Sequence, residues 1–148
     1  MTMPRMMYDE RLIAPIRQDL TSIGFTELRS AQEVDETLQQ ATGTTLVVVN
    51  SVCGCSARMA RPALRHAVAT ASAKPERLTT VFAGQDAEAT ERARSYFTGY
   101  TPSSPSIALL KDGKLVYMME RWQIESRPAE VIAADLIAAF ETHCASGA

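Results

Sequence analysis

The chain of 148 residues is 46% hydrophobic and 22% charged, with a formal net charge of −2 at pH 7. These values exclude a disordered or strongly basic chain, so we expect no nucleic-acid partner and a single globular domain over residues 1–148. The first residues lack the apolar stretch of a secretory signal, and the longest apolar run, residues 46–49, is far too short to span a bilayer. We therefore expect a cytoplasmic protein that does not bind membranes.

The N-terminal part of the chain predicts two helices and a short strand. Apolar residues recur every three or four positions over residues 6–23, which predicts an amphipathic helix that Pro15 should kink or split. Residues 25–28 are a candidate strand. Ser30 and Glu33 then form a capping-box pattern, which predicts a helix to about residue 41.

The central part predicts strands alternating with helices. Thr44–Asn50 is apolar almost without interruption, which is typical of a strand covered on both faces. A helix is expected from the following Cys-Gly-Cys turn to about residue 73, and then a strand over residues 78–83. Asp86 is expected to act as the N-cap of a helix over residues 87–97.

The C-terminal part predicts a β-hairpin and a last helix. Asp112-Gly113 is a strong hairpin signal between strands at residues 106–110 and 114–119, and the helix should begin near Pro128. The whole order predicts an α/β protein, a three-layer α/β/α sandwich whose mixed sheet carries a C-terminal hairpin, with an extra N-terminal helix. With a cysteine pair after one strand and Pro105 just before the hairpin, this arrangement resembles thioredoxin.

Two of the three cysteines, Cys53 and Cys55, are separated only by Gly54 and cannot join distant parts of the fold. Cys53 lies where a strand ends and a helix begins, and unpaired N–H groups and the helix dipole there favour the nucleophilic thiolate. We predict that Cys53 attacks disulfides and that Cys55 resolves the mixed disulfide. Gly54 should adopt the unusual backbone angles that closure of the small Cys-x-Cys ring requires, and strain in that ring suits a weak reductant.

Three other interpretations of the cysteines stay open. Free cysteines often serve as small buried hydrophobic residues. Cys53, Cys55, His143 and Cys144 supply enough donors for a zinc ion or a cluster, although no Cys-x-x-Cys spacing is present and no metal site is expected. A redox-controlled interaction domain is the third possibility. Cys144 is expected to be non-catalytic.

Other residues around the cysteine pair have two interpretations each. Arg58, Arg61 and Arg65 share one stripe of the expected helix and form either an anion-attracting rim beside the thiol or a solvated face. Pro62 should kink this helix. Trp122 is expected to cover the core.

These motifs together resemble the bacilliredoxins, Cys-Gly-Cys proteins of the thioredoxin superfamily. The likeness runs nearly end to end and is carried by five segments: TTLVVVNSVCGC at residues 44–55, ARP at 60–62, VFAGQD at 81–86, YFTGY at 96–100 and PSSPS at 102–106. The resemblance implies a thiol–disulfide oxidoreductase that removes the small thiol bacillithiol from S-bacillithiolated proteins. Bacillithiol is then a co-substrate, and no bound cofactor is implied.

The resemblance also implies roles for particular residues. Cys53 takes the thiol onto itself, and Cys55 or a second bacillithiol regenerates the enzyme, with protein disulfide isomerase activity as a further possibility. Pro105 matches a cis proline that faces the cysteines, and Ser104 matches the residue whose backbone contacts the substrate. We expect Ser104, Pro105, Gly54 and Arg58 to contact the substrate. The strand before the pair offers Asn50 but no carboxylate as proton acceptor, so efficient general reduction of protein disulfides is not expected.

Overall fold

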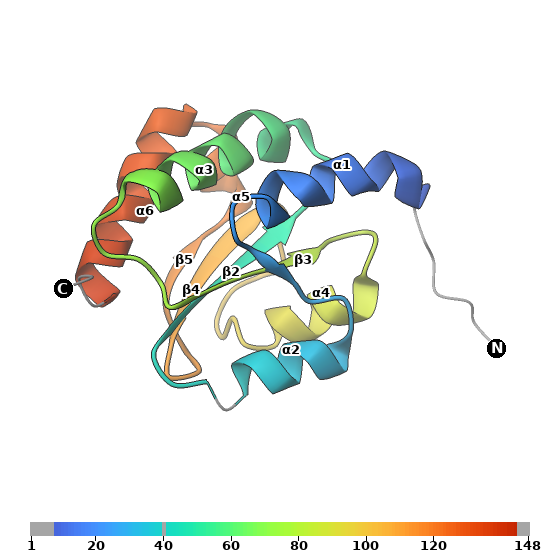
Figure 1. Cartoon of the computed structure of the whole chain (residues 1–148), viewed down its shortest axis with the longest axis horizontal. Coiled ribbons are helices and arrows are strands. Elements are labelled where there is room, and N and C mark those ends of the chain that lie inside the picture. The colour runs from blue at the N-terminus through green and yellow to red at the C-terminus, as the bar shows by residue number, and fades with distance from the viewer. Residues whose placement is uncertain (1–7, 40, 145–148) are drawn as a thin grey trace.

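The structure is a computed structural model of the chain that describes residues 8–39 and 41–144. Five strands form one mixed sheet in the order β1-β3-β2-β4-β5, with helices on both faces (Figure 1). The strands are β1 (Thr26–Glu27), β2 (Thr44–Asn50), β3 (Arg77–Phe82), β4 (Ser106–Lys111) and β5 (Lys114–Met119). The helices are α1 (Glu10–Thr21), α2 (Ala31–Leu38), the π-helical η1 (Ser56–Ala60), α3 (Arg61–Thr70), α4 (Ala87–Arg94), α5 (Arg121–Glu125) and α6 (Ala129–His143). The predicted three-layer sandwich is confirmed.

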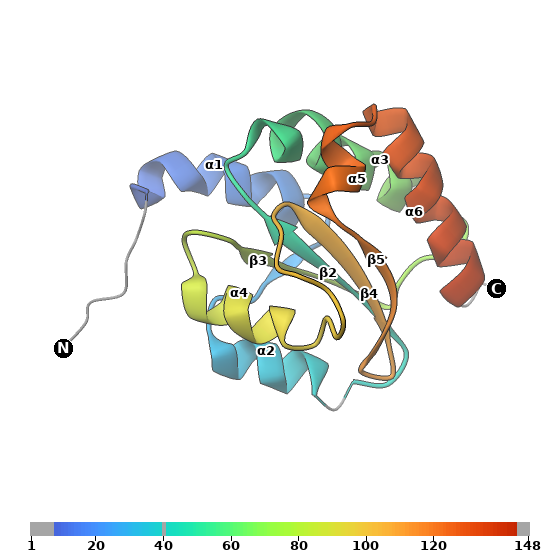
Figure 2. The same cartoon turned by 180° about the vertical axis from the view of Figure 1, so that it is seen from behind.

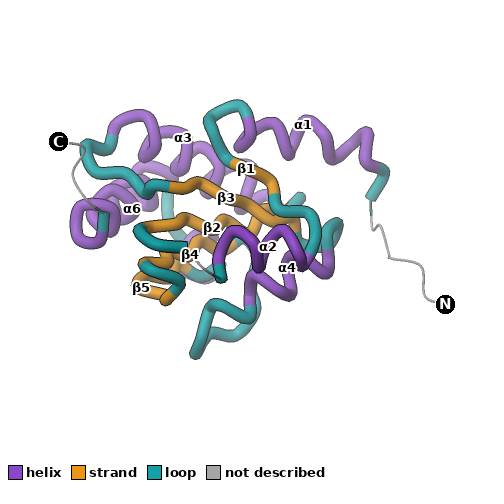
Figure 3. Tube along the Cα trace, turned by 60° about the horizontal axis from the view of Figure 1, so that its bottom comes forward, coloured by secondary structure: helices purple, strands orange, loops and turns teal. Residues whose placement is uncertain are grey.

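Strand β2 is the centre of the sheet, parallel to β3 on one side and antiparallel to β4 on the other. All of its residues are buried, because its side chains enter two separate cores. Leu46 and Val48 pack in the core under α1, α3 and α6, whereas Val47 and Val49 pack in the core under α2 and α4. Figure 3 shows α2 and α4 together on one side of the strands. The uninterrupted apolar run of β2 follows from this double coverage.

Helix α1 is continuous through Pro15, so the predicted split of this helix is wrong. Pro15 is exposed, and the carbonyl left unpaired by its missing N–H, that of Arg11, lies on the same solvent-facing side of the helix. The helix begins after the N-cap Asp9, and the predicted start at residues 6 and 7 lies outside the described residues. Gly24, with φ of +104°, lies in the turn that follows the last residue of α1, Thr21.

Two predicted helix starts use their capping residues differently. The Ser30 side chain accepts a hydrogen bond from the Glu33 backbone N–H, as predicted, but the Glu33 carboxylate accepts from the N–H of Arg29, one residue before the cap. Asp86 makes no capping bond at the start of α4. Its carboxylate instead accepts from the buried guanidinium of Arg17 at 2.7 Å, which ties α1 to this end of the sheet.

The hairpin is confirmed, with positive φ at both Asp112 and Gly113, as a tight two-residue turn requires. Helix α5 after the hairpin was not predicted. Its capping box is formed by Glu120 and Gln123, and Glu120 is not among the residue types that usually cap a helix. The prediction for Trp122 is wrong, since its side chain is 64% exposed and Ile124 is the buried residue of this helix. Every helix among the described residues is too short or too polar to cross a bilayer.

Candidate functional site

Cys53 lies three residues beyond the end of β2, at the start of the next helical segment. Its sulfur atom takes the position of a capping group there. Its carbonyl accepts hydrogen bonds from the backbone N–H groups of Ser56 at 3.0 Å and Ala57 at 3.1 Å. Its Sγ accepts from the N–H of Cys55 at 3.4 Å, the bond that a capping side chain normally makes with an oxygen. The thiol therefore sits at the positive end of a helical turn, as the sequence predicts.

The two thiols of the pair differ in acidity. Burial acts to raise the pKa of Cys53, but the backbone N–H and the thiol of Cys55, followed by the Arg121 guanidinium, outweigh burial, and the pKa of Cys53 lies below its ordinary value. Burial raises the pKa of Cys55, and the hydrogen bond and negative charge of Cys53 raise it further. The environment thus favours the thiolate at Cys53 and the protonated thiol at Cys55.

Gly54 has no positive φ in this structure, in which the ring of the cysteine pair is open. All three cysteines are free, and Gly54 is absent from the glycines with positive φ among the described residues. A methyl group added at Gly54 would meet nothing within 4 Å. The reduced form therefore does not need a glycine at this position, and a role in closing the Cys53–Cys55 ring stays a prediction.

The helix after the cysteines begins with a wide turn, and the kink at Pro62 stays a prediction. The N–H of Arg61 bonds to the carbonyl of Ser56, five residues back, and only from Arg61 onward does a regular α-helix run. Such π-helical turns occur often at functional sites. A π-helical turn closes a hydrogen bond over five residues instead of four. The residues after it are therefore rotated about the helix axis relative to their places in a regular α-helix.

The structure separates the three arginines predicted to share one stripe. Arg58 and Arg65 are exposed, but Arg61 is 5% exposed and points beneath the cysteine turn. Arg61 is held inside by hydrogen bonds to Asn50, Ser51 and Ser56, so the three arginines form neither the common rim nor the common solvated face. A role for Arg58 in substrate binding stays a prediction.

Arg61 is the centre of a buried polar network under the cysteine turn. Its Nη1 donates to the Asn50 Oδ1 at 3.0 Å, the Ser51 carbonyl at 3.1 Å and the Ser56 Oγ at 3.0 Å, and its Nε donates to Asp19. The Ser51 Oγ in turn accepts from the backbone N–H of Cys53 at 3.2 Å. Arg61 thus fixes residues on both sides of the cysteine pair without contacting either sulfur.

Asn50 closes this network at the end of β2. Its Oδ1 accepts from the Ser51 N–H at 2.9 Å and the Ser56 hydroxyl at 2.9 Å in addition to Arg61. The amide is buried and its oxygen is occupied by three donors. This arrangement agrees with the expectation that Asn50 does not serve as a proton acceptor for the resolving thiol.

The loop before β4 lies against the same end of the sheet. The Ser104–Pro105 peptide bond is cis, which confirms that prediction, and Pro105 is buried. The Ser104 carbonyl accepts from the Nη1 of Arg121 at 3.4 Å. Because the charge of Arg121 also acts on Cys53, this arginine connects the loop with the thiol. Arg121 belongs to the helix that was not predicted, and the pattern Glu120-x-x-Gln123 was the signal that could have revealed it.

Cys144 lies at the opposite end of the sheet from the cysteine pair. It is buried, which raises the pKa of its thiol, and with His143 it lines a small hollow that includes Thr44, the first residue of β2. Cys53 follows the last residue of β2, and a strand of seven residues is about 20 Å long. The four donors of the zinc interpretation therefore do not converge, and Cys144 is too distant to resolve a disulfide on Cys53.

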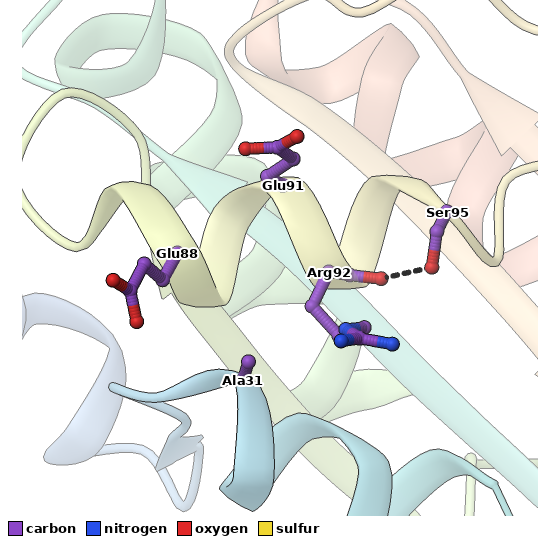
Figure 4. A pocket seen from close by; sticks show the side chains of 5 residues that line it. All are labelled: Ala31, Glu88, Glu91, Arg92 and Ser95. Carbon is purple, nitrogen blue, oxygen red and sulfur yellow. Dashed lines mark hydrogen bonds between the residues drawn. The ribbon is translucent and has the colours of Figure 1, made fainter.

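A second hollow lies between α2 and α4 and is also separate from the cysteines. Figure 4 shows the side chains that line it, those of Ala31, Glu88, Glu91, Arg92 and Ser95. Its lining includes neither cysteine of the pair nor any residue of the loop before β4. This hollow is therefore not part of the site around Cys53.

Comparisons with known proteins agree with this site. A family model described as "Disulphide isomerase" matches residues 8–144. A bacilliredoxin of Koribacter versatilis is 53% identical over 142 residues, which is 96% of this chain and 97% of the relative. A bacilliredoxin of Geobacillus kaustophilus is 49% identical over 137 residues, 93% of this chain and 94% of the relative.

The comparison of folds leads to the thioredoxins. A thioredoxin of Malassezia sympodialis superposes with a TM-score of 0.58 at 14% identity, over 82% of this chain and 92% of that one. Mitochondrial thioredoxin 3 of Saccharomyces cerevisiae, in its oxidized form, gives 0.54 at 18% identity, over 84% and 98% of the two chains. At these identities the likeness concerns the fold, which is that of thioredoxin.

The unequal acidity of the two thiols predicts unequal pH profiles. Thiolates are alkylated and thiols are not, so the alkylation rate of Cys53 should rise with pH around a midpoint below the ordinary value of about 8.5, and that of Cys55 around a midpoint above it. Iodoacetamide labelling over about pH 5–10, with peptide mass spectrometry, measures both. In Cys53→Ser the midpoint of Cys55 should fall, because the neighbouring charge is gone. Equal midpoints, or the reverse order, would contradict the assignment.

The buried network predicts that Arg61 and Arg58 differ in their effect on stability. Arg61→Ala removes charge-assisted bonds to buried partners and should lower the free energy of unfolding by about 2–3 kcal/mol. Arg58→Ala changes an exposed side chain three positions earlier and should stay within about 0.5 kcal/mol of the wild type. Urea unfolding of both variants checks this. Similar losses for the two would show that Arg61 is not the structural member of the pair.

Proposed function

The chain belongs to the bacilliredoxin family and is a thiol–disulfide oxidoreductase, and from this premise we propose that it removes bacillithiol from S-bacillithiolated proteins through Cys53, with Cys55 as the resolving thiol. Its partners are then thiol-modified proteins, and bacillithiol is a co-substrate rather than a bound cofactor. The single observation that supports the assignment of roles is the position of the Cys53 sulfur. It caps a helical turn and accepts the N–H of Cys55.

The proposed reaction begins with attack by the Cys53 thiolate on the bacillithiol sulfur of the mixed disulfide. A bond forms between Cys53 and bacillithiol as the bond between bacillithiol and the protein breaks. The electron pair of the broken bond leaves with the protein sulfur, which takes a proton from water. The target protein is thereby reduced, and Cys53 carries the bacillithiol.

Regeneration follows one of two balanced routes. In the first, Cys55 loses its proton and attacks the Cys53 sulfur, so that bacillithiol leaves as a thiol and a Cys53–Cys55 disulfide forms. Two further bacillithiol molecules then reduce this disulfide and leave as bacillithiol disulfide, which returns both cysteines to thiols. In the second, another bacillithiol attacks, leaves as bacillithiol disulfide and returns Cys53 to the thiolate. The first attack favours the first route. Once Cys53 is in a mixed disulfide it carries no negative charge, so the pKa of Cys55 falls and its thiolate forms more readily.

Protein disulfide isomerase activity is a second proposed use of the same pair. The family model that matches residues 8–144 carries this activity in its description. Isomerisation needs a thiolate that attacks readily and also leaves readily, and a thiol whose pKa is lowered has both properties. The absence of a carboxylate in β2, whose last residue is Asn50, also fits exchange better than net reduction.

The roles of the two cysteines predict opposite results for two substitutions. Cys53→Ser should abolish removal of bacillithiol, since no thiolate remains at the helix start. Cys55→Ser should keep the first attack and accumulate a bacillithiol adduct on Cys53, because the resolving thiol is missing. Incubation of each variant with a bacillithiolated protein, followed by peptide mass spectrometry, measures the adducts. Cys144→Ser serves as the control and should behave as wild type. An adduct found on Cys55 in preference to Cys53 would reverse the two roles.

A further inference from the structure

Arg121 is the arginine that the structure places at the mouth of the thiol site, and its contacts tie it to the loop before β4. It begins α5, which lies beside the helical segment after the cysteines (Figure 2). Its backbone N–H donates to the Ser103 Oγ at 3.3 Å and its Nη1 donates to the Ser104 carbonyl at 3.4 Å. Its Nε donates to the Glu125 carboxylate at 3.1 Å.

The guanidinium of Arg121 keeps donors free for a ligand. An arginine side chain has five N–H groups, and the contacts within the described residues use one at Nε and one at Nη1, so three are left. The side chain is 46% exposed, which leaves room for an incoming group. Its contacts with Ser103 and Ser104 and the packing of α5 against η1 place it at the same end of the sheet as the cysteines, and its positive charge acts on the sulfurs of both Cys53 and Cys55.

We infer that Arg121 is the specificity-determining residue of the site, and that it binds a carboxylate of the small thiol in the mixed disulfide. The inference rests on the proposed function and names what that function leaves open, the group that recognises an anionic low-molecular-weight thiol. The predicted arginine rim assigned this task to the helix after the cysteines, but Arg61 is buried in the network beneath the turn. Arg121, from the other side of the site, presents a guanidinium suited to a carboxylate.

Binding of the carboxylate also decides which sulfur is attacked. A mixed disulfide offers two sulfurs, and attack on the small thiol's sulfur transfers that thiol to Cys53 and expels the protein thiolate, which takes a proton from water. Attack on the other sulfur would link Cys53 to the protein and expel the small thiol instead. A carboxylate held by Arg121 keeps the small thiol beside Cys53, so the first outcome is favoured.

The test compares two mixed disulfides that differ in one group. A model protein is linked through its cysteine to N-acetylcysteine, which has a carboxylate, or to N-acetylcysteine amide, which does not. Second-order rate constants are measured for the Cys55→Ser protein, alone and with Arg121→Gln, Arg121→Lys or Arg65→Gln. The pH is set so that Cys53 is fully ionised in every variant, which removes the effect of Arg121 on the pKa of Cys53.

We expect the ratio of the acid rate to the amide rate to fall about fivefold in Arg121→Gln, the effect of one exposed ion pair. Arg121→Lys should keep part of the ratio because it keeps the charge. Arg65→Gln, which removes an exposed charge of the same helical layer, should leave the ratio unchanged. Mass spectrometry of the Cys53 adduct should show more protein adduct and less small-thiol adduct in Arg121→Gln. Equal losses for acid and amide, or the same change in Arg65→Gln, would overturn the inference.

A parallel measurement with bacillithiol separates this inference from the proposed function. If the wild type removes bacillithiol but Arg121→Gln leaves the acid-to-amide ratio unchanged, the inference fails and the proposed function stands. If the wild type does not remove bacillithiol but the ratio falls in Arg121→Gln, the proposed substrate is wrong and Arg121 still selects anionic thiols. The two failures therefore give different results.

Discussion

The buried guanidinium of Arg61 is the constraint on which the reactive turn depends. A charged group with so little exposure is stable only when its N–H groups are paired, and its partners are the carbonyl of Ser51, the side chains of Asn50 and Ser56, and Asp19. These partners come from the end of the central strand, the start of the helix and α1. The Arg61 side chain thus connects β2, η1 and α1. These hydrogen bonds hold the residues on both sides of the cysteine turn in place.

The sheet determines where this junction lies. Because β2 is covered on both faces and buried to its last residue, the chain first reaches solvent beyond the strand, at Val52, and Cys53 is the next residue. The loop before β4 arrives beside it, since β4 is the antiparallel neighbour of β2 and begins where β2 ends. Cys53, the cis bond before Pro105 and Arg121 are far apart in sequence, and the order of the strands brings their segments to one end of the molecule.

Local and periodic features of the sequence predicted most of this arrangement. The apolar run of β2, the Asp112-Gly113 turn and the glycine-flanked cysteines each have a physical cause within a few residues, so a single sequence reveals them. The burial of Arg61 could not be predicted in this way, because it depends on tertiary contacts with the end of β2 and with α1, whereas Arg65, one turn later in the same regular helix, is exposed. Arg121 was missed for another reason. Its role depends on a tertiary contact between α5 and the cysteine turn, and α5 itself is only five residues long.

The exposed position of Trp122 has a practical consequence for spectroscopy. It is the sole tryptophan of the chain, and it lies on the short helix that borders the reactive turn, with its indole N–H bonded to Glu120 at 3.0 Å. Tryptophan fluorescence, excited at wavelengths that tyrosine absorbs weakly, therefore originates at one place beside the site. A change of charge or packing at the cysteines that extends to α5 is then seen in the tryptophan emission of an unlabelled sample.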